Sequence, residues 1–261
     1  MPNEKQRGTT VRIRRVKFTI AYDGTAFSGW QSQADGNAIQ DHLERALLRV
    51  TGNKVRLHGA GRTDAGVHAL GQCAHADLST ALSAERLRAA LNASLPPAIR
   101  ILRCNFAGRS FHARFSATGK VYRYRIATGP VLSPFEIGRA WHVIASLDPG
   151  LVRQATEAFL GQHDFGGFAA NRGKPVKSTI RTIRRVRIQR SRGIMTLEFE
   201  GDGFLYKMIR LMVGAIVQCA SSKATVEQMQ ACLRSGKAPA RPIVAPAHGL
   251  TLVRVRYAEN R

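Results

Sequence analysis

Acidic residues are scarce in this sequence. Its 261 residues include 17 aspartates and glutamates against 40 lysines and arginines, which gives a formal net charge of +23. A metal-dependent nuclease would need several clustered carboxylates, and the sequence contains no such cluster, so that class is disfavoured. An excess of positive charge this large usually indicates a polyanionic partner, of which nucleic acid is the commonest.

Long apolar runs and paired cysteines are also missing. The longest apolar stretch, residues 211–220, is too short to span a bilayer, and the N-terminus lacks the apolar core of a secretory signal. No lysine-rich amphipathic helix is predicted, which disfavours an anionic membrane surface as the partner. The cysteines form no CxxC pair and are interpreted as small buried side chains of a reducing compartment: Cys73, Cys104, Cys219 and Cys232. We therefore expect a cytoplasmic protein that does not bind membranes.

The hydrophobic pattern of the first half predicts the element order β-α-β-β-α-β. Strands are expected at residues 16–22, 54–58, 70–77 and 99–106. One helix is expected to begin at a capping box formed by Asn37 and Gln40 and to end at Gly52, and a second to begin at Ser83. The chain is long enough for one large domain or two small ones.

The second half predicts the same order again. Strands are expected at residues 121–126, 180–189, 194–201 and 250–257, and helices after Asp148-Pro149, at about 204–220 and at 225–235, where Thr225 and Gln228 form a capping box. Residues 111–120 would bridge the halves. We therefore expect an α/β fold of two ferredoxin-like, or RRM-like, halves, residues 1–107 and 108–261, with mainly antiparallel sheets flanking a central basic active-site cleft.

The stretch GAGRTDAGVHA, residues 59–69, isolates one carboxylate. Asp64 is the only acidic residue between Glu44 and Asp77, and Arg62 precedes it by two positions. An aspartate in a glycine-rich loop is usually a turn residue that accepts backbone hydrogen bonds. In an extended segment, however, Asp64 and Arg62 would point the same way, and the glycines would let a substrate approach closely. A lone carboxylate suits a nucleophile or a stabiliser of positive charge better than a classical glycosidase.

A second candidate is Arg210, in the apolar segment FLYKMIRLMVGAIV, residues 204–217. The segment predicts a buried helix, and an arginine there needs an anionic partner. The partner is either Glu200 or Asp202, in a structural salt bridge, or Asp64 across the cleft. The spacing favours neither alternative.

Aromatic and basic residues alternate in the predicted strand 121–126. Tyr122 and Tyr124 share one face, and two arginines share the other. Such tyrosines are usually core residues, but in a nucleic-acid-binding protein they can stack on bases. The run from Arg172 to Arg192 contains nine basic residues and no acidic one, which favours contact with phosphates over a merely solvated surface.

Three histidines, His58, His68 and His75, flank Asp64 and could in principle ligate a metal. Their spacings match no standard zinc pattern, and His68 and His75 are expected on opposite faces of a strand. We therefore expect no metal.

GAGRTDAGVHA resembles the catalytic loop of the TruA family of tRNA pseudouridine synthases. Four further motifs resemble those of the same family: YDGTAFSGWQSQ (22–33), FHARFSATGKVYRY (111–124), GDGFLYKMIRLMVG (201–214) and APAHGLTLVRVRY (245–257). The resemblance covers nearly the whole chain. The sequence departs from the family pattern at residues 1–12, in the strand after the catalytic loop and around residues 170–192.

This resemblance implies a role for each candidate residue. Asp64 would be the catalytic aspartate, with Arg210 paired to it. Tyr122 would stack on the target uracil, and Arg62 would help to extrude the target base. The family isomerises uridine to pseudouridine at positions 38–40 of the tRNA anticodon stem-loop, as a homodimer and without a metal or an organic cofactor.

The main alternative is a non-catalytic RNA-binding protein with paired RRM-like sheets. It would explain the charge but not Asp64 together with Arg62, and the sequence lacks an RNP1-type aromatic string.

Overall fold

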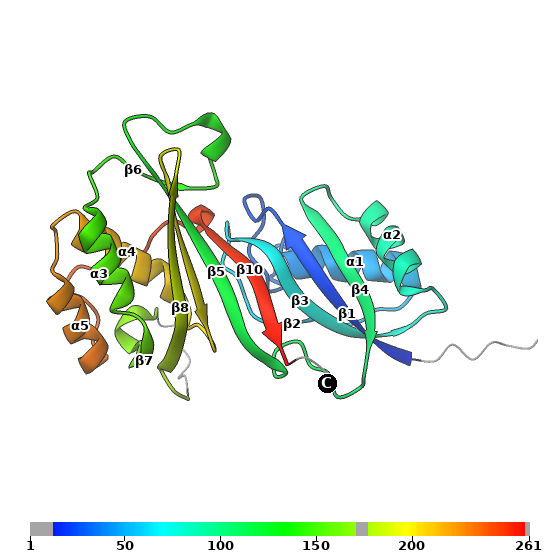
Figure 1. Cartoon of the computed structure of the whole chain (residues 1–261). Coiled ribbons are helices and arrows are strands. Elements are labelled where there is room, and N and C mark those ends of the chain that lie inside the picture. Colours follow the sequence, from blue (N-terminus) through cyan, green and yellow to red (C-terminus); the bar gives the residue numbers. More distant parts are fainter. Residues whose placement is uncertain (1–12, 171–176, 259–261) are drawn as a thin grey trace, which may run out of the picture.

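The computed structural model describes residues 13–170 and 177–258 as a mixed α/β fold built on one ten-stranded sheet (Figure 1). The strands are β1 (Ile13–Tyr22), β2 (His58–Gly59), β3 (His68–Ser79), β4 (Ile99–Ala107), β5 (Ala117–Thr128), β6 (Trp141–Val143), β7 (Gly161–Asp164), β8 (Ile180–Ser191), β9 (Ile194–Gly201) and β10 (Leu250–Tyr257). The α-helices are α1 (Ile39–Thr51), α2 (Ala84–Ser94), α3 (Pro149–Glu157), α4 (Met208–Ala220) and α5 (Val226–Ser235).

The sheet is mostly antiparallel, as the sequence predicts. Its strands follow the order β4-β1-β3-β10-β5-β9-β8-β7, while β2 pairs with β3 and β6 pairs with β5. The two parallel pairings are β10 with β3 and β6 with β5. The β3–β10 pairing places Thr251 opposite His68 and joins the strands of both halves into one sheet (Figure 1).

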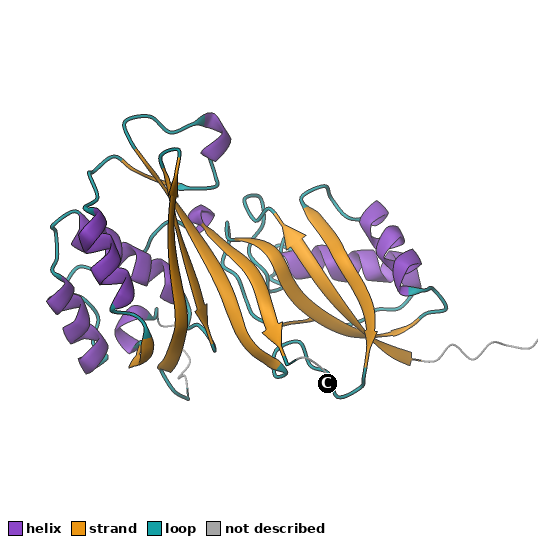
Figure 2. Ribbon diagram, in the orientation of Figure 1, coloured by secondary structure: helices purple, strands orange, loops and turns teal. Residues whose placement is uncertain are grey.

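The helices form two groups, α1 and α2 near the first four strands, and α3, α4 and α5 at the far end of the second half (Figure 2). One hydrophobic core runs through both halves and includes Phe18 and Ile20 from β1 and Phe199 from β9. Helix α4 is buried along nearly its whole length, as its all-round apolar sequence predicts.

Local signals explain where several helices begin. The predicted capping box of α5 is present, because Thr225 Oγ1 accepts the N–H of Gln228 and Gln228 Oε1 accepts the N–H of Thr225. Ser83 caps α2 as predicted, and Asp148 accepts the N–H of Leu151 at the start of α3. These side chains satisfy N–H groups that the first helical turn leaves without partners.

The predicted start of α1 is wrong by one residue. Ala38 occupies the N-cap, and Asp41 Oδ2 accepts its N–H at 3.1 Å. The Asn37 side chain instead donates to the Ala26 carbonyl, which ties the helix start to the preceding loop. Gly52 ends the helix as predicted, with a φ of 70°.

Other boundaries differ for tertiary reasons. Helix α4 begins at Met208 rather than near Phe204, because Lys207 adopts a left-handed φ of 59° and interrupts the helix there. The strand expected at residues 54–58 is reduced to β2, and the short strands β6 and β7 were not predicted. The bridge between the halves is residues 108–116, because β5 already begins at Ala117.

Three of the cysteines are buried as predicted, but Cys232 is only partly buried. Of the helices in the described ranges, none is long and apolar enough to cross a membrane. Residues 1–12, and residues 172–176 at the start of the basic run, lie outside the described residues.

Candidate active site

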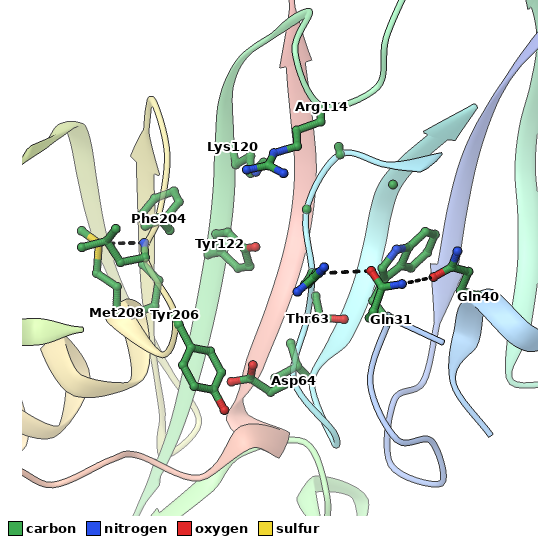
Figure 3. Close-up of a pocket in the computed structure, with 18 of the residues that line it drawn as sticks. Gln31, Gln40, Thr63, Asp64, Arg114, Lys120, Tyr122, Phe204, Tyr206 and Met208 are labelled. Atoms are coloured by element: carbon green, nitrogen blue, oxygen red, sulfur yellow. Dashed lines mark hydrogen bonds between the residues drawn. The ribbon is translucent and has the colours of Figure 1, made fainter. Parts of the chain in front are cut away.

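A cleft of about 850 Å³ opens where the two halves of the sheet meet (Figure 3). It is lined by Asp64 from the loop before β3, Tyr122 from β5, Phe204 from the segment before α4, and Leu250 at the start of β10. The cleft is therefore built from segments far apart in the sequence, and its volume is in the range of small-molecule and nucleotide sites.

The loop that carries Asp64 is held from both sides. The N–H of Trp30 donates to the Thr63 carbonyl at 3.0 Å, and the Tyr22 hydroxyl lies 2.8 Å from Thr63 Oγ1. The N–H of Val67 donates to the carbonyl of Asp64 itself, which closes a turn. The carboxylate therefore projects from a fixed backbone.

Gly29, in the opening motif, packs directly against this loop. Its φ is 90°, and a Cβ there would lie 2.7 Å from the Thr63 carbonyl oxygen. Only glycine combines this conformation with so close a backbone approach. The opening motif therefore supports the Asp64 loop.

The structure brings Arg210 to Asp64 across the cleft. Arg210 Nη1 donates to Asp64 Oδ2 at 3.0 Å, and the two side chains are only 14% and 17% exposed. Arg210 Nε donates to the Ala245 carbonyl at 2.7 Å, which orients the guanidinium. Of the two alternatives left open by the sequence, the pairing with Asp64 is the one observed. Glu200 instead accepts hydrogen bonds from Arg185 of β8 and from Arg256 of β10.

Tyr122 and Tyr124 differ although they share a strand face. Tyr124 is fully buried and donates its hydroxyl to the Pro246 carbonyl at 2.8 Å, as a core tyrosine does. Tyr122 lines the cleft, and its ring meets Phe204 edge-on with 5.1 Å between centroids. On the opposite face of the strand, Arg123 is ion-paired to Glu198 and Arg125 to Glu136.

The Tyr122 phenol is held in its neutral form. Burial, together with the neighbouring Tyr22 and Asp64, raises the pKa of Tyr122 well above its ordinary value. At neutral pH its hydroxyl can therefore donate a hydrogen bond, and phenolate is scarce.

Arg62 lies at the edge of the cleft and is exposed. Its Nε donates to Gln31 Oε1 at 3.1 Å, and Gln31 Nε2 donates to Gln40 Oε1 at 2.8 Å (Figure 3). Gln40 is only 2% exposed and donates to Glu44 and the Leu57 carbonyl. This chain of amides connects Arg62 to α1. This chain was not predicted, although a glutamine on the apolar face of α1 is a visible signal in the sequence.

The histidines near Asp64 form an aromatic group rather than an evident metal site. The rings of His58 and His75 stack with 5.1 Å between centroids, and His112 lies 4.6 Å from His75. Burial, with His112, Arg15 and His58 nearby, lowers the pKa of His75 to about 4. His68 points elsewhere and contacts Asp23. Among the residues described, no group of three or more His, Cys, Asp or Glu side chains is arranged to hold a metal ion.

Known proteins are similar to this sequence over nearly its whole length. A family model described as tRNA pseudouridine synthase matches residues 19–116 and 155–258. The chain belongs to the tRNA pseudouridine synthase family. A tRNA pseudouridine synthase A of Akkermansia muciniphila is 45% identical over 256 residues, which cover 95% of this chain and 97% of that protein. A tRNA pseudouridine synthase A of Acetivibrio thermocellus is 40% identical over 94% of this chain and all of that protein.

The resemblance drawn from the five motifs is thereby confirmed at the level of the tRNA pseudouridine synthase family. All five motifs contribute to the cleft or to its support, since the opening motif holds the Asp64 loop and the C-terminal motif supplies Ala245 and Leu250. Many of the other lining residues were not predicted from the sequence, among them Lys120, Phe204 and Tyr206.

We expect two substitutions of Tyr122 to separate stacking from hydroxyl chemistry. Tyr122→Leu removes the ring, and because stacking contributes roughly 1–3 kcal/mol per base, capture of a target base should weaken by about tenfold or more. Tyr122→Phe keeps the ring against Phe204 and should bind normally but slow a chemical step. Single-turnover rates over a range of enzyme concentrations measure both effects. Wild-type behaviour of the Leu variant would show Tyr122 to be a packing residue only.

Proposed function

We propose that the protein isomerises uridine to pseudouridine in the anticodon stem-loop of tRNA, at positions 38–40. Membership of the tRNA pseudouridine synthase family supports this reaction. The observation that carries the proposal is the pairing of Asp64 with Arg210 in a cleft that Tyr122 also lines.

The reaction needs one well-placed carboxylate. The N1–C1′ bond breaks, the uracil turns, and C5 bonds to C1′, so C1′ passes through an electron-poor state. Asp64 is proposed to attack or stabilise C1′. The uracil stays in the cleft and returns to the same carbon, so no second carboxylate is needed to activate water. Arg210 offsets the cost of holding the Asp64 carboxylate in a half-buried position.

The target base must leave its stack before it can react. Tyr122 is proposed to stack on the uracil, and Arg62, at the mouth of the cleft, is proposed to occupy the space that the base vacates. The amide chain through Gln31 and Gln40 supports this role, because it positions Arg62 from a buried residue of α1.

After C5 bonds to C1′, the C5 proton must leave and N1 must gain one. Tyr122 and Tyr206 both bring an aromatic hydroxyl to the cleft. Burial keeps Tyr122 protonated at neutral pH, so its hydroxyl suits hydrogen-bond donation better than unassisted proton removal. A proton relay through its hydroxyl requires the phenol to give up a proton as it takes one.

The basic strand β8 is proposed to contact the tRNA backbone. Its arginines are largely exposed, and the Arg185–Glu200 pair accounts for only one of them. The excess of positive charge over the whole chain supports binding of a polyanion.

We further propose that the chain consists of two ferredoxin-like halves, residues 1–107 and 108–261, and acts as a homodimer without metal or organic cofactor. The strand orders β4-β1-β3-β2 and β10-β5-β9-β8 support the division, because each is the order of a ferredoxin-like sheet. The loop between β5 and β6 supports a protein interface, since Val131 and Phe135 are more than 80% exposed.

The function is tested with a tRNA transcript tritiated at C5 of its uridines, because pseudouridine formation releases that hydrogen. Purified protein in EDTA should release tritium in an amount equal to the pseudouridine found after digestion. RNA binding without release would favour the non-catalytic RNA-binding alternative. Chain cleavage that EDTA suppresses would favour a nuclease.

A further inference from the structure

Lys120 lies in the cleft without a role in the chemistry described above. It precedes Tyr122 by two residues on β5, so both side chains lie on the same face of the strand. A Cβ on Gly61 would lie 2.9 Å from Lys120 Nζ, which places the ammonium group directly against the loop that carries Asp64. Gly61 thus leaves the space that the ammonium group occupies.

The surroundings of Lys120 are cationic. Arg114, from the bridge between the halves, and Arg181, from β8, line the same cleft. Burial, followed by the charges of Arg114 and Arg181, lowers the pKa of Lys120 to about 8. In the part of the chain that the structure describes, the ammonium group of Lys120 forms no ion pair and no hydrogen bond.

This arrangement is costly for the protein alone. A half-buried ammonium group without an anionic partner is unfavourable, and two neighbouring guanidinium groups add repulsion. A bound anion would remove both penalties. RNA brings such an anion into the cleft with every nucleotide.

The order of groups along the cleft indicates which anion fits. In Figure 3, Lys120 and Arg114 lie together at one end, Asp64 lies toward the other, and Tyr122 lies between them. A nucleotide with its uracil on Tyr122 and its C1′ at Asp64 must also place its phosphate backbone in the cleft. Among the described residues that line the cleft, the acidic side chain is Asp64, so the cationic end can accept a phosphate.

We propose that Lys120, assisted by Arg114 and Arg181, binds a phosphodiester that flanks the target uridine and so sets the position of its C1′ against Asp64. The inference rests on the proposed function, and it names the contact that fixes the position of the extruded nucleotide in the cleft. Because the arginines stay charged, Lys120 is the member of the trio that titrates near neutral pH.

The test uses anticodon stem-loop RNAs with one uncharged methylphosphonate linkage, on either the 5′ or the 3′ side of the target uridine. The nucleotide before the linkage carries a 2′-methoxy group in each RNA and in its charged reference. For the wild-type protein, one of the two RNAs should bind about tenfold more weakly than its reference, as expected for loss of a charge-assisted hydrogen bond. Lys120→Met should bind the same methylphosphonate RNA less than about threefold more weakly than its charged reference, because this variant already lacks the side chain that contacts the phosphate.

Lys120→Arg should restore the tenfold discrimination. Lys223→Met, which removes an exposed positive charge between α4 and α5, serves as the matched control and should behave as wild type. The inference would be overturned if, for both methylphosphonate RNAs, the wild-type protein and Lys120→Met showed the same loss of affinity relative to the charged reference.

The pH profile gives a readout that a purely structural lysine would not change. Wild-type affinity for the unmodified stem-loop should fall as the pH rises through about 8, where Lys120 loses its charge, and Lys120→Arg should lack this fall. Two neighbouring groups keep one protonation state across this range: the raised pKa of Tyr122 keeps its phenol neutral, and the lowered pKa of His112 keeps its ring neutral. A fall that persists unchanged in Lys120→Arg would also contradict the inference. Failure of wild-type protein to release tritium would instead contradict the proposed function, so the two failures are distinguishable.

Discussion

Asp64→Asn is expected to abolish pseudouridine formation while leaving tRNA affinity within about threefold of wild type. The amide retains an oxygen that can accept the hydrogen bond from Arg210 Nη1, so the fold of the loop should persist. It lacks the charge and nucleophilicity that C1′ requires, and losses of a nucleophile reach several orders of magnitude, roughly 10⁴-fold or more. Single-turnover tritium release and equilibrium binding with the same tRNA measure the two quantities.

Asp77→Asn is the matched control for this substitution. Asp77 is the next acidic residue along the chain, half-exposed and paired with Arg15 at 2.7 Å. A pair so exposed contributes about 0–1 kcal/mol, so this variant should remain active. Pseudouridine made by pure Asp64→Asn protein, at any rate above about a thousandth of wild type, would remove Asp64 from the proposed mechanism.

Arg210→Ala is expected to affect stability as well as activity. It removes the guanidinium group that contacts the half-buried Asp64 carboxylate, and with it the hydrogen bond from Nε to the Ala245 carbonyl. Breaking a buried pair costs about 3–5 kcal/mol, and because both side chains keep some exposure we expect about 3 kcal/mol. For a chain of this size that corresponds to a lower melting temperature by roughly 6–12 °C. Turnover should fall with it, because the carboxylate is no longer held in place.

A double-mutant cycle separates the pair from the packing of α4. In the Asp64→Asn background, Arg210→Ala should lower the free energy of unfolding clearly less than it does in wild type, because residue 64 then carries no charge. Arg210→Lys should keep most of the stability but lose part of the turnover. A lysine ammonium group lacks the two separate N–H groups with which the Arg210 guanidinium contacts Asp64 and Ala245. Equal costs of Arg210→Ala in both backgrounds would show that the pair does not stabilise the protein.

Much of the fold was predictable because its signals are local. Thr225 and Gln228 are three residues apart and cap the same helix, and Gly52 ends α1 through its own backbone conformation. The alternation in β1, β5, β9 and β10 likewise needs no information from elsewhere in the chain. Where a competing local contact exists, as for Asn37, the same reasoning places the helix start wrongly.

The site was only partly predictable, because its contacts join distant residues. Asp64 and Arg210 are 146 positions apart, and spacing could not choose between that pair and one with Glu200. The choice depends on the two arginines that already bind Glu200 in the folded sheet. The placement of Lys120 against Gly61 could not be predicted from the sequence either, since β5 and the loop that carries Asp64 meet only in the tertiary structure.

The position of β10 has a consequence for how the protein is made. In chain order β10 follows all of the other described elements, yet it lies in the middle of the sheet, between β3 and β5. The ribosome therefore exposes every other strand before the one that connects the halves. Until β10 emerges, the edges of β3 and β5 that it will cover remain unpaired, and such edges are vulnerable to wrong pairing. The cleft consequently forms only after β10 has emerged, when Leu250 and its neighbours bring its two walls together.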